Sequence, residues 1–91
     1  MRAYVLVHAI EGETGATLAL LRRTRGVLSA HRMAGARDIL ALVDGDSIDD
    51  LDGIVAERIG VMPGIFGARA SFHLGGLETT VRETDERGTL R

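Results

Sequence analysis

Residues 27–44 read VLSAHRMAGARDILALVD, and this stretch decides the fold. Residues 27–34 and 38–44 are rich in apolar residues and predict two β-strands. Between them lie residues 35–37 (GAR), a short glycine-containing connection that is typical of a β-hairpin. The stretch therefore predicts an antiparallel strand pair near the middle of the chain.

The flanking segments predict a strand and a helix before the hairpin and a helix after it. Residues 3–10 (AYVLVHAI) are rich in strand-forming residues. Residues 16–23 (ATLALLRR) predict a helix that Gly26 ends, and its basic last turn suits the negative end of the helix dipole. Beyond the hairpin, Ser47 is a good N-cap, and apolar residues at helical spacing predict an amphipathic helix over 48–59.

The last predicted strand, residues 65–74, follows a Pro-Gly turn. The order β-α-β-β-α-β predicts an α+β fold of ferredoxin-like type, with an antiparallel sheet and two helices on one face. Residues 75–91 are polar, which predicts a flexible C-terminal tail or a short added edge strand around Thr79–Arg82. We therefore expect one folded domain over residues 1–74 and a tail over 75–91.

The composition limits the chemistry. The 91 residues make one domain, and the absence of cysteine excludes disulfides and thiolate catalysis. With only three dispersed histidines, no metal site and no cofactor are expected. The net charge of −2 lacks the basic excess of a nucleic-acid binder. The longest apolar run is too short to span a bilayer and no signal peptide is present, so we expect a cytoplasmic protein without membrane contact.

The apolar pattern of the strands predicts self-association. In the first strand Tyr4, Leu6 and Ile10 lie on one side and Val5 and Val7 on the other, and the strand after the hairpin turn has the same two-sided character. Two helices cover only one face of the sheet, so the other face would be an exposed apolar patch. We therefore expect a homodimer that stacks these faces or joins its sheets edge to edge. The alternative is that the C-terminal tail folds back over the open face.

This organisation resembles the ligand-binding half of the Lrp/AsnC family of feast/famine regulators, known as the RAM domain. The resemblance covers about residues 3–74, and it is carried by AYVLVHAI, RGVLSAHRMAGARDILALVD, SIDDLDGIVAERI and MPGIFGARASF. The family's G-x-aromatic-D turn falls on residues 35–38. Full-length members have a helix-turn-helix DNA-binding domain before this part. Because the first strand begins at Ala3, the chain resembles a stand-alone version of the ligand-binding half.

The resemblance implies a dimer formed through the sheets, often assembled further into a ring of dimers, and no enzymatic activity. It implies a small effector, typically an amino acid, held between dimers near the 35–38 turn. It also makes full-length family regulators candidate partners for mixed assembly. The positions implied in ligand binding are Gly35, Ala36, Arg37, Asp38, Ala68, Ala70 and Ser71.

Two departures from the family pattern affect this site. Arg37 stands where the family has an aromatic residue, and Ala68 and Ala70 stand where it often has hydroxyl residues, leaving Ser71 as the nearest hydroxyl. A guanidinium could favour an acidic ligand through a bidentate contact, or the site could be structural or empty. The turn also has a purely structural explanation, because glycine supplies positive φ and aspartate can bond its own backbone.

Three functions remain open from the sequence. The first is a non-enzymatic module of transcriptional-regulator type that binds a small molecule and oligomerises. The second is a cofactor-free dimeric enzyme with a cleft between sheet and helices, in which His8 or His31 would be the base. Adjacent strands could bring these two histidines together. The third is an architectural oligomer without a ligand. For the histidines themselves a surface or interface role is expected.

Overall fold

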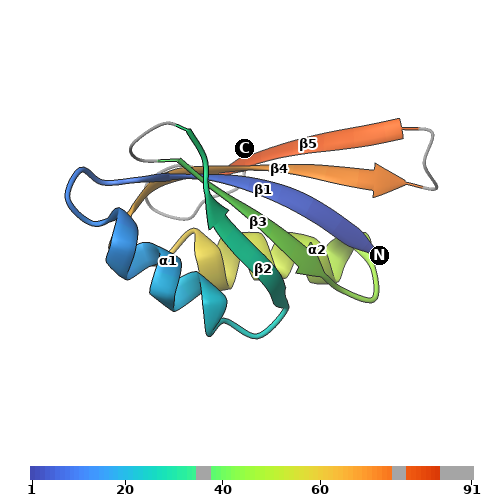
Figure 1. Ribbon diagram of the computed structural model, residues 1–91. Helices are drawn as coiled ribbons and strands as arrows, with labels where there is room; N and C mark the ends of the chain where they lie inside the picture. Colours follow the sequence, from blue (N-terminus) through green and yellow to red (C-terminus); the bar gives the residue numbers. More distant parts are fainter. Residues whose placement is uncertain (35–37, 75–77, 85–91) are drawn as a thin grey trace.

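The computed structural model describes residues 1–34, 38–74 and 78–84 and contains a five-stranded antiparallel sheet (Figure 1). The strands are β1 (Arg2–Ala9), β2 (Val27–Arg32), β3 (Asp38–Asp44), β4 (Ile65–Leu74) and β5 (Glu78–Thr84). The helical segments are α1 (Thr14–Arg22), α2 (Ile48–Gly53) and the π-helical segment η1 (Ile54–Ile59), which follows α2 directly. The strand order β2-β3-β1-β4-β5 confirms the predicted ferredoxin-like fold.

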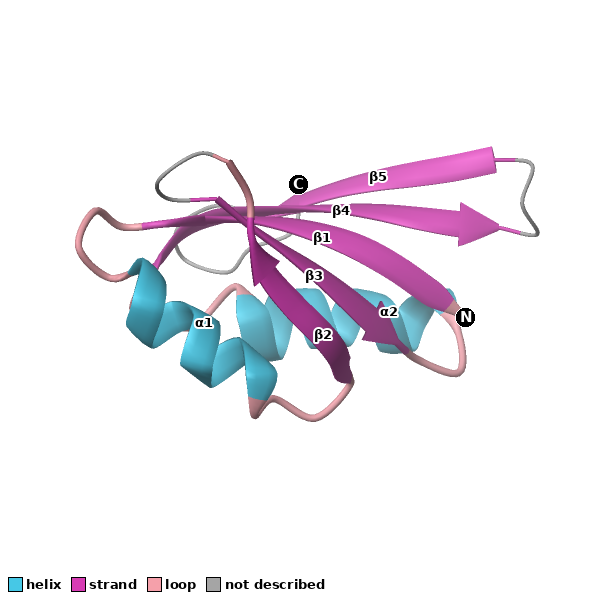
Figure 2. Cartoon of the chain, viewed as in Figure 1, coloured by secondary structure: helices cyan, strands magenta, loops and turns pink. Residues whose placement is uncertain are grey.

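The core lies between the sheet and the helices, which cover one face (Figure 2). Alternate residues of neighbouring strands point toward the helices and are fully buried. They are Ala3, Val5 and Val7 of β1 and Ile39, Ala41 and Val43 of β3. The helical layer contributes Leu21, Leu51, Val55 and Ile59. This aliphatic core follows from the two-residue period of the strands and the apolar stripe of the helices.

The opposite face of the sheet carries a patch of apolar side chains. Tyr4 is 45% exposed, and Leu6, Leu40 and Leu42 are half-buried. The β1–β3 register places Tyr4 opposite Leu42 and Leu6 opposite Leu40, so the four side chains are cross-strand neighbours. We refer to these four residues as the open-face patch. In the part of the chain that the structure describes, both helices lie on the other side of the sheet.

The helices match their predicted positions with two differences. α1 begins at Thr14, two residues earlier than predicted, while Gly26 with φ +96° confirms the turn that leads into β2. The Ser47 hydroxyl accepts a hydrogen bond from the Asp50 amide at 3.1 Å, which confirms the N-cap. The helix predicted over 48–59 is present, but its second half is a π-helix, in which the Gly60 amide donates to the Val55 carbonyl at 2.7 Å.

The polar C-terminal segment contains the edge strand that the sequence left as one of two alternatives. β5 pairs with β4 from Ala68↔Thr84 to Leu74↔Glu78 and forms the border of the sheet. The domain boundary that the sequence predicts after residue 74 therefore lies between two strands that pair in the same sheet. Residues 85–91 lie outside the described residues.

Candidate functional site

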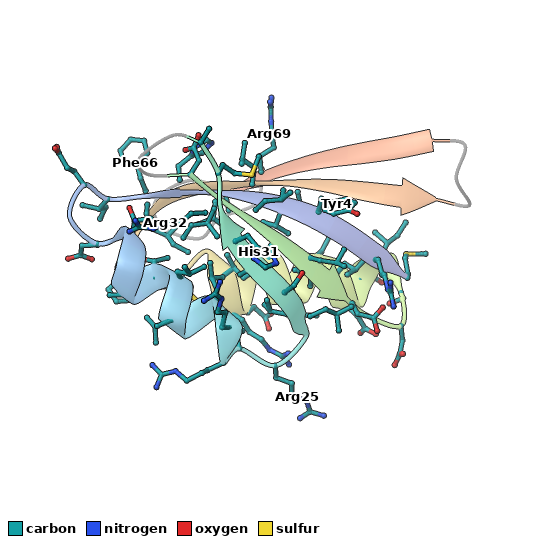
Figure 3. The ribbon with its side chains drawn as sticks, viewed as in Figure 1. Tyr4, Arg25, His31, Arg32, Phe66 and Arg69 are labelled. Carbon is teal, nitrogen blue, oxygen red and sulfur yellow. The ribbon has the colours of Figure 1, made fainter. Side chains whose placement is uncertain are left out.

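A β-bulge at the end of β1 exposes an aromatic side chain. His8 pairs with Gly67 and Ala9 pairs with Ile65, so Phe66 is an extra residue between the two pairs. A bulge of this kind redirects the side chain of the inserted residue. Phe66 is 63% exposed, and Figure 3 shows it with Arg69 on the side of the sheet away from the helices.

An imidazole and a carboxylate meet beside this bulge. The β1–β3 register places His8 directly opposite Asp38, the first residue of β3. The Nδ1 atom of His8 lies 2.9 Å from Oδ1 of Asp38, and because a carboxylate only accepts, the N–H of the imidazole is the donor. The two side chains are 44% and 39% exposed, so the pair stabilises the fold little and remains accessible to a ligand.

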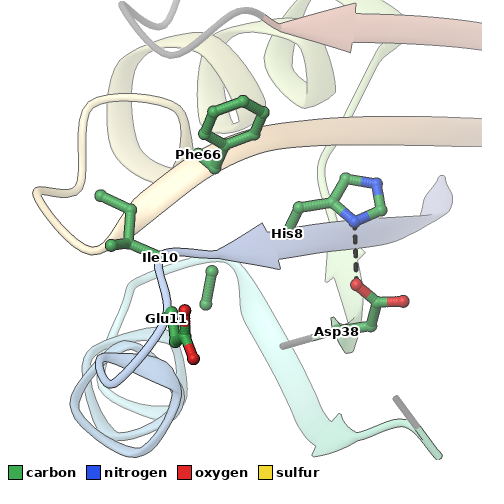
Figure 4. A pocket seen from close by; sticks show the side chains of 6 residues that line it. His8, Ile10, Glu11, Asp38 and Phe66 are labelled. Atoms are coloured by element: carbon green, nitrogen blue, oxygen red, sulfur yellow. Dashed lines mark hydrogen bonds and ion pairs between the residues drawn. The ribbon is translucent and has the colours of Figure 1, made fainter. Parts of the chain in front are cut away.

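These residues line a groove of about 640 Å³ at the end of β1 (Figure 4). The described residues that line it are His8, Ala9, Ile10, Glu11, Asp38 and Phe66. Phe66 and Ile10, the latter 42% exposed, form an apolar wall. His8, Asp38 and Glu11 supply the polar groups. The volume lies in the range of about 300–1,000 Å³ that is typical of small-molecule sites.

The structure brings some of the predicted site residues to this groove. Asp38 lines it, whereas residues 35–37 (Gly35, Ala36 and Arg37) lie outside the described residues. Ala68 and Ala70 are buried in the core on the helix side, so their methyl groups do not face the groove. Ser71 pairs in register with Tyr4 of the open-face patch. The contribution of Ala68, Ala70 and Ser71 to ligand binding stays a prediction.

The sequence interpretation did not assign Phe66, Ile10 and Glu11 to the site. A signal for Phe66 was available, because Ile65 and Phe66 are consecutive in a strand and only one of them can face the core. The sequence also leaves open that His8 and His31 lie together on adjacent strands, and the strand order excludes this alternative. β3 lies between β1 and β2, so the two histidines belong to strands that are not neighbours.

The described residues show neither a metal site nor a membrane span. Among them, no group of three or more His, Asp or Glu side chains is placed to hold a metal ion. No helix in the described ranges is long and apolar enough to cross a bilayer.

Comparison with known proteins gives one family. The sequence profile of the Lrp/AsnC ligand binding domain matches residues 2–85. The crystal structure of FFRP-DM1 is similar with a TM-score of 0.70 and 26% identity, over 76% of this chain and 92% of that one. A search of the curated proteins finds no significant match.

Two further solved structures support the fold alone, because their identity is lower. A protein of Thermus thermophilus has a TM-score of 0.70 and 22% identity, over 76% of this chain and 86% of that one. AsnC of E. coli has a TM-score of 0.65 and 20% identity, over 76% of this chain and 48% of that one. The similarity therefore extends over about half of AsnC.

Proposed function

This chain belongs to the Lrp/AsnC ligand binding domain family, and we propose that it is a regulatory module that binds a small effector in the groove at the end of β1. The effector is an amino acid or a related metabolite, and the chain has no catalytic role. The observation that carries the proposal is the position of the groove. It contains Asp38, the last residue of the turn where the resemblance implies an effector.

The open-face patch supports self-assembly as the second part of this function. Tyr4, Leu6, Leu40 and Leu42 are contiguous apolar side chains on the sheet face that no helix of the described residues covers, and such patches mark interaction sites. A second copy of the chain, stacked through the same face, is the occupant we propose. Full-length regulators of the family are proposed partners for mixed assembly, since about half of AsnC of E. coli has a similar fold.

The groove and the patch share one side of the sheet, which links binding to assembly. His8 continues the β1 face that carries Tyr4 and Leu6, since alternate residues of a strand point the same way. Asp38 likewise continues the β3 face of Leu40. A copy seated on the open-face patch would therefore lie next to the groove, and an effector would alter the strength of that contact.

The proposal is tested by a screen of the twenty common amino acids. An effector that binds only the folded state at 100 times its Kd adds about 2.7 kcal/mol to the free energy of unfolding. For a chain of this length that corresponds to a rise in Tm of roughly 10–20 °C. The same samples are analysed by sedimentation velocity. If no amino acid changed either the Tm or the assembly size, the proposal would be contradicted.

One observation favours a second candidate function, the cofactor-free enzyme. A histidine paired with a carboxylate in a groove is the arrangement of a general base and the residue that orients it. Against it, the space between sheet and helices, where that hypothesis places its cleft, is filled by core side chains in the described residues. Mass spectrometry of recovered ligand distinguishes the two: a regulatory module returns its effector unchanged, and an enzyme converts it.

A further inference from the structure

We propose that the groove selects its ligand by an ammonium group, so that its ligand class is an apolar primary amine and the carboxylate of an amino acid is dispensable. This inference rests on the proposed function, because it names the chemical class that the groove accepts. It follows from the charges that line the groove, from the accessible oxygen of Asp38 and from the apolar wall.

The charged groups at the groove favour a cation. The described lining residues include the carboxylates of Asp38 and Glu11 and no arginine or lysine. Carboxylates attract a ligand cation and repel a ligand carboxylate, and a concave site strengthens both effects. Among the described residues that line the groove, the imidazole of His8 is the only group that could donate to an anionic ligand, and that imidazole is already engaged with Asp38.

Asp38 offers a specific acceptor for the ammonium group. His8 donates to Oδ1, whereas Oδ2 has no partner among the described residues. The side chain is 39% exposed, so a ligand reaches this oxygen without displacing protein atoms. An ammonium group has three donors and makes a charge-assisted hydrogen bond to a carboxylate. His8 meanwhile holds the carboxylate in place.

The apolar wall accounts for the rest of the ligand. Phe66 presents its ring beside the groove and Ile10 extends the same wall, as Figure 4 shows. A ligand with its ammonium group at Asp38 places its apolar portion against this wall and removes both surfaces from water. An aromatic portion would also stack on the Phe66 ring. The groove therefore fits a ligand with one cationic end and one apolar end.

The test uses three ligands that differ only in their charged groups. They are 2-phenylethylamine, phenylalanine and 3-phenylpropionate, which carry an ammonium group alone, both groups, and a carboxylate alone. Each is titrated into the full chain by isothermal titration calorimetry at pH 7 and low salt. We expect 2-phenylethylamine and phenylalanine to bind, and 3-phenylpropionate to bind at least about tenfold more weakly, because it lacks the charge-assisted hydrogen bond.

A matched pair of variants locates the binding energy. Asp38→Asn keeps the shape of the side chain but removes its charge, and should weaken 2-phenylethylamine binding about tenfold. Asp46→Asn makes the same change at an exposed residue beyond the other end of β3, and should leave the affinity within about twofold. Because the three-ligand comparison uses the unaltered chain, it does not depend on how Asp38→Asn folds.

The outcomes separate this inference from the proposed function. The inference is overturned if 3-phenylpropionate binds as tightly as 2-phenylethylamine, if a correctly folded Asp38→Asn variant binds the amine unchanged, or if 2-phenylethylamine does not bind. An amino acid that binds while its decarboxylated amine does not would overturn the ammonium inference and support the proposed function. If no amino acid bound in the full screen but 2-phenylethylamine bound clearly, the proposed function would be contradicted and the ammonium inference supported.

Discussion

Replacement of Gly64 by alanine should destabilise the protein because the first turn of α1 lies against this residue. A Cβ atom on Gly64 would overlap the hydroxyl oxygen of Thr17 and lie 2.9 Å from Oε2 of Glu13. The Glu13 side chain is exposed and can move away. Thr17 is buried, and a β-branched residue in a helix has few rotamers into which its hydroxyl can turn. The Gly64 carbonyl also accepts a hydrogen bond from the Ile10 amide at 2.8 Å, so a shift of this backbone strains that bond.

The size of the effect follows from overpacking. One extra methyl group in a region that is already well packed lowers the free energy of unfolding by about 1–3 kcal/mol. In a domain of this length that lowers the Tm by roughly 5–20 °C. Gly53 is the matched control, because a Cβ there meets no atom within 4 Å and its φ of −61° is helical. Gly53→Ala should therefore raise the free energy of unfolding by about 0.5–1 kcal/mol.

The assay is urea unfolding of each variant at one fixed protein concentration, since self-assembly makes stability depend on concentration. Thr17→Ala should lower the free energy of unfolding less in the Gly64→Ala background than in the original chain. The difference, which is the coupling energy of the two changes, should be at least about 0.5 kcal/mol. This is expected because Thr17→Ala removes the overlapping hydroxyl. Unchanged stability of Gly64→Ala, or strict additivity of the two changes, would refute the described packing of α1 against Gly64.

Three further predictions concern assembly and folding. Leu42→Glu places a charge in the open-face patch and should dissociate the assembly, as measured by sedimentation velocity. The control Leu20→Glu, at an exposed position of α1, should leave the assembly intact. The same sedimentation behaviour of both variants would contradict the open-face patch as the interface. Ser47→Ala removes the cap of α2 and should cost about 1 kcal/mol in urea unfolding, and no loss would contradict the capping role. Leu51→Ala leaves a cavity in the core and should cost about 2–5 kcal/mol in the same assay, so a loss below about 1 kcal/mol would show that the residue is not buried.

The fold could be predicted because its signals are local. The hairpin, the Ser47 cap and the apolar stripe of 48–59 each depend on neighbours within one or two turns. Accordingly β2 and β3 pair antiparallel, Ser47 caps α2, and residues 48–59 are helical with a π-helical second half. The sequence predicts a start of α1 two residues too late because Thr14 and Gly15 are weak helix formers. The sequence predicts β5 only as one of two alternatives because ETTVRET lacks the alternation that a half-buried strand shows.

The candidate site was predicted only in part because it depends on contacts between distant segments. Asp38 could be identified from the turn motif, which lies within one short stretch. Its pairing with His8 depends on the β1–β3 register, and the exposure of Phe66 depends on a bulge that inserts one residue opposite β1. The apolar alternation within a strand indicates which face is buried. It does not identify which residues of two distant strands lie opposite each other, or where an extra residue is inserted.

The most direct test of the account is the solution mass of the unaltered chain, measured by sedimentation equilibrium at micromolar concentration. We predict at least two copies per particle, because no helix of the described residues covers the four neighbouring apolar side chains of the open-face patch. A folded protein with the mass of one chain across that range would contradict the proposed assembly and its link to the groove.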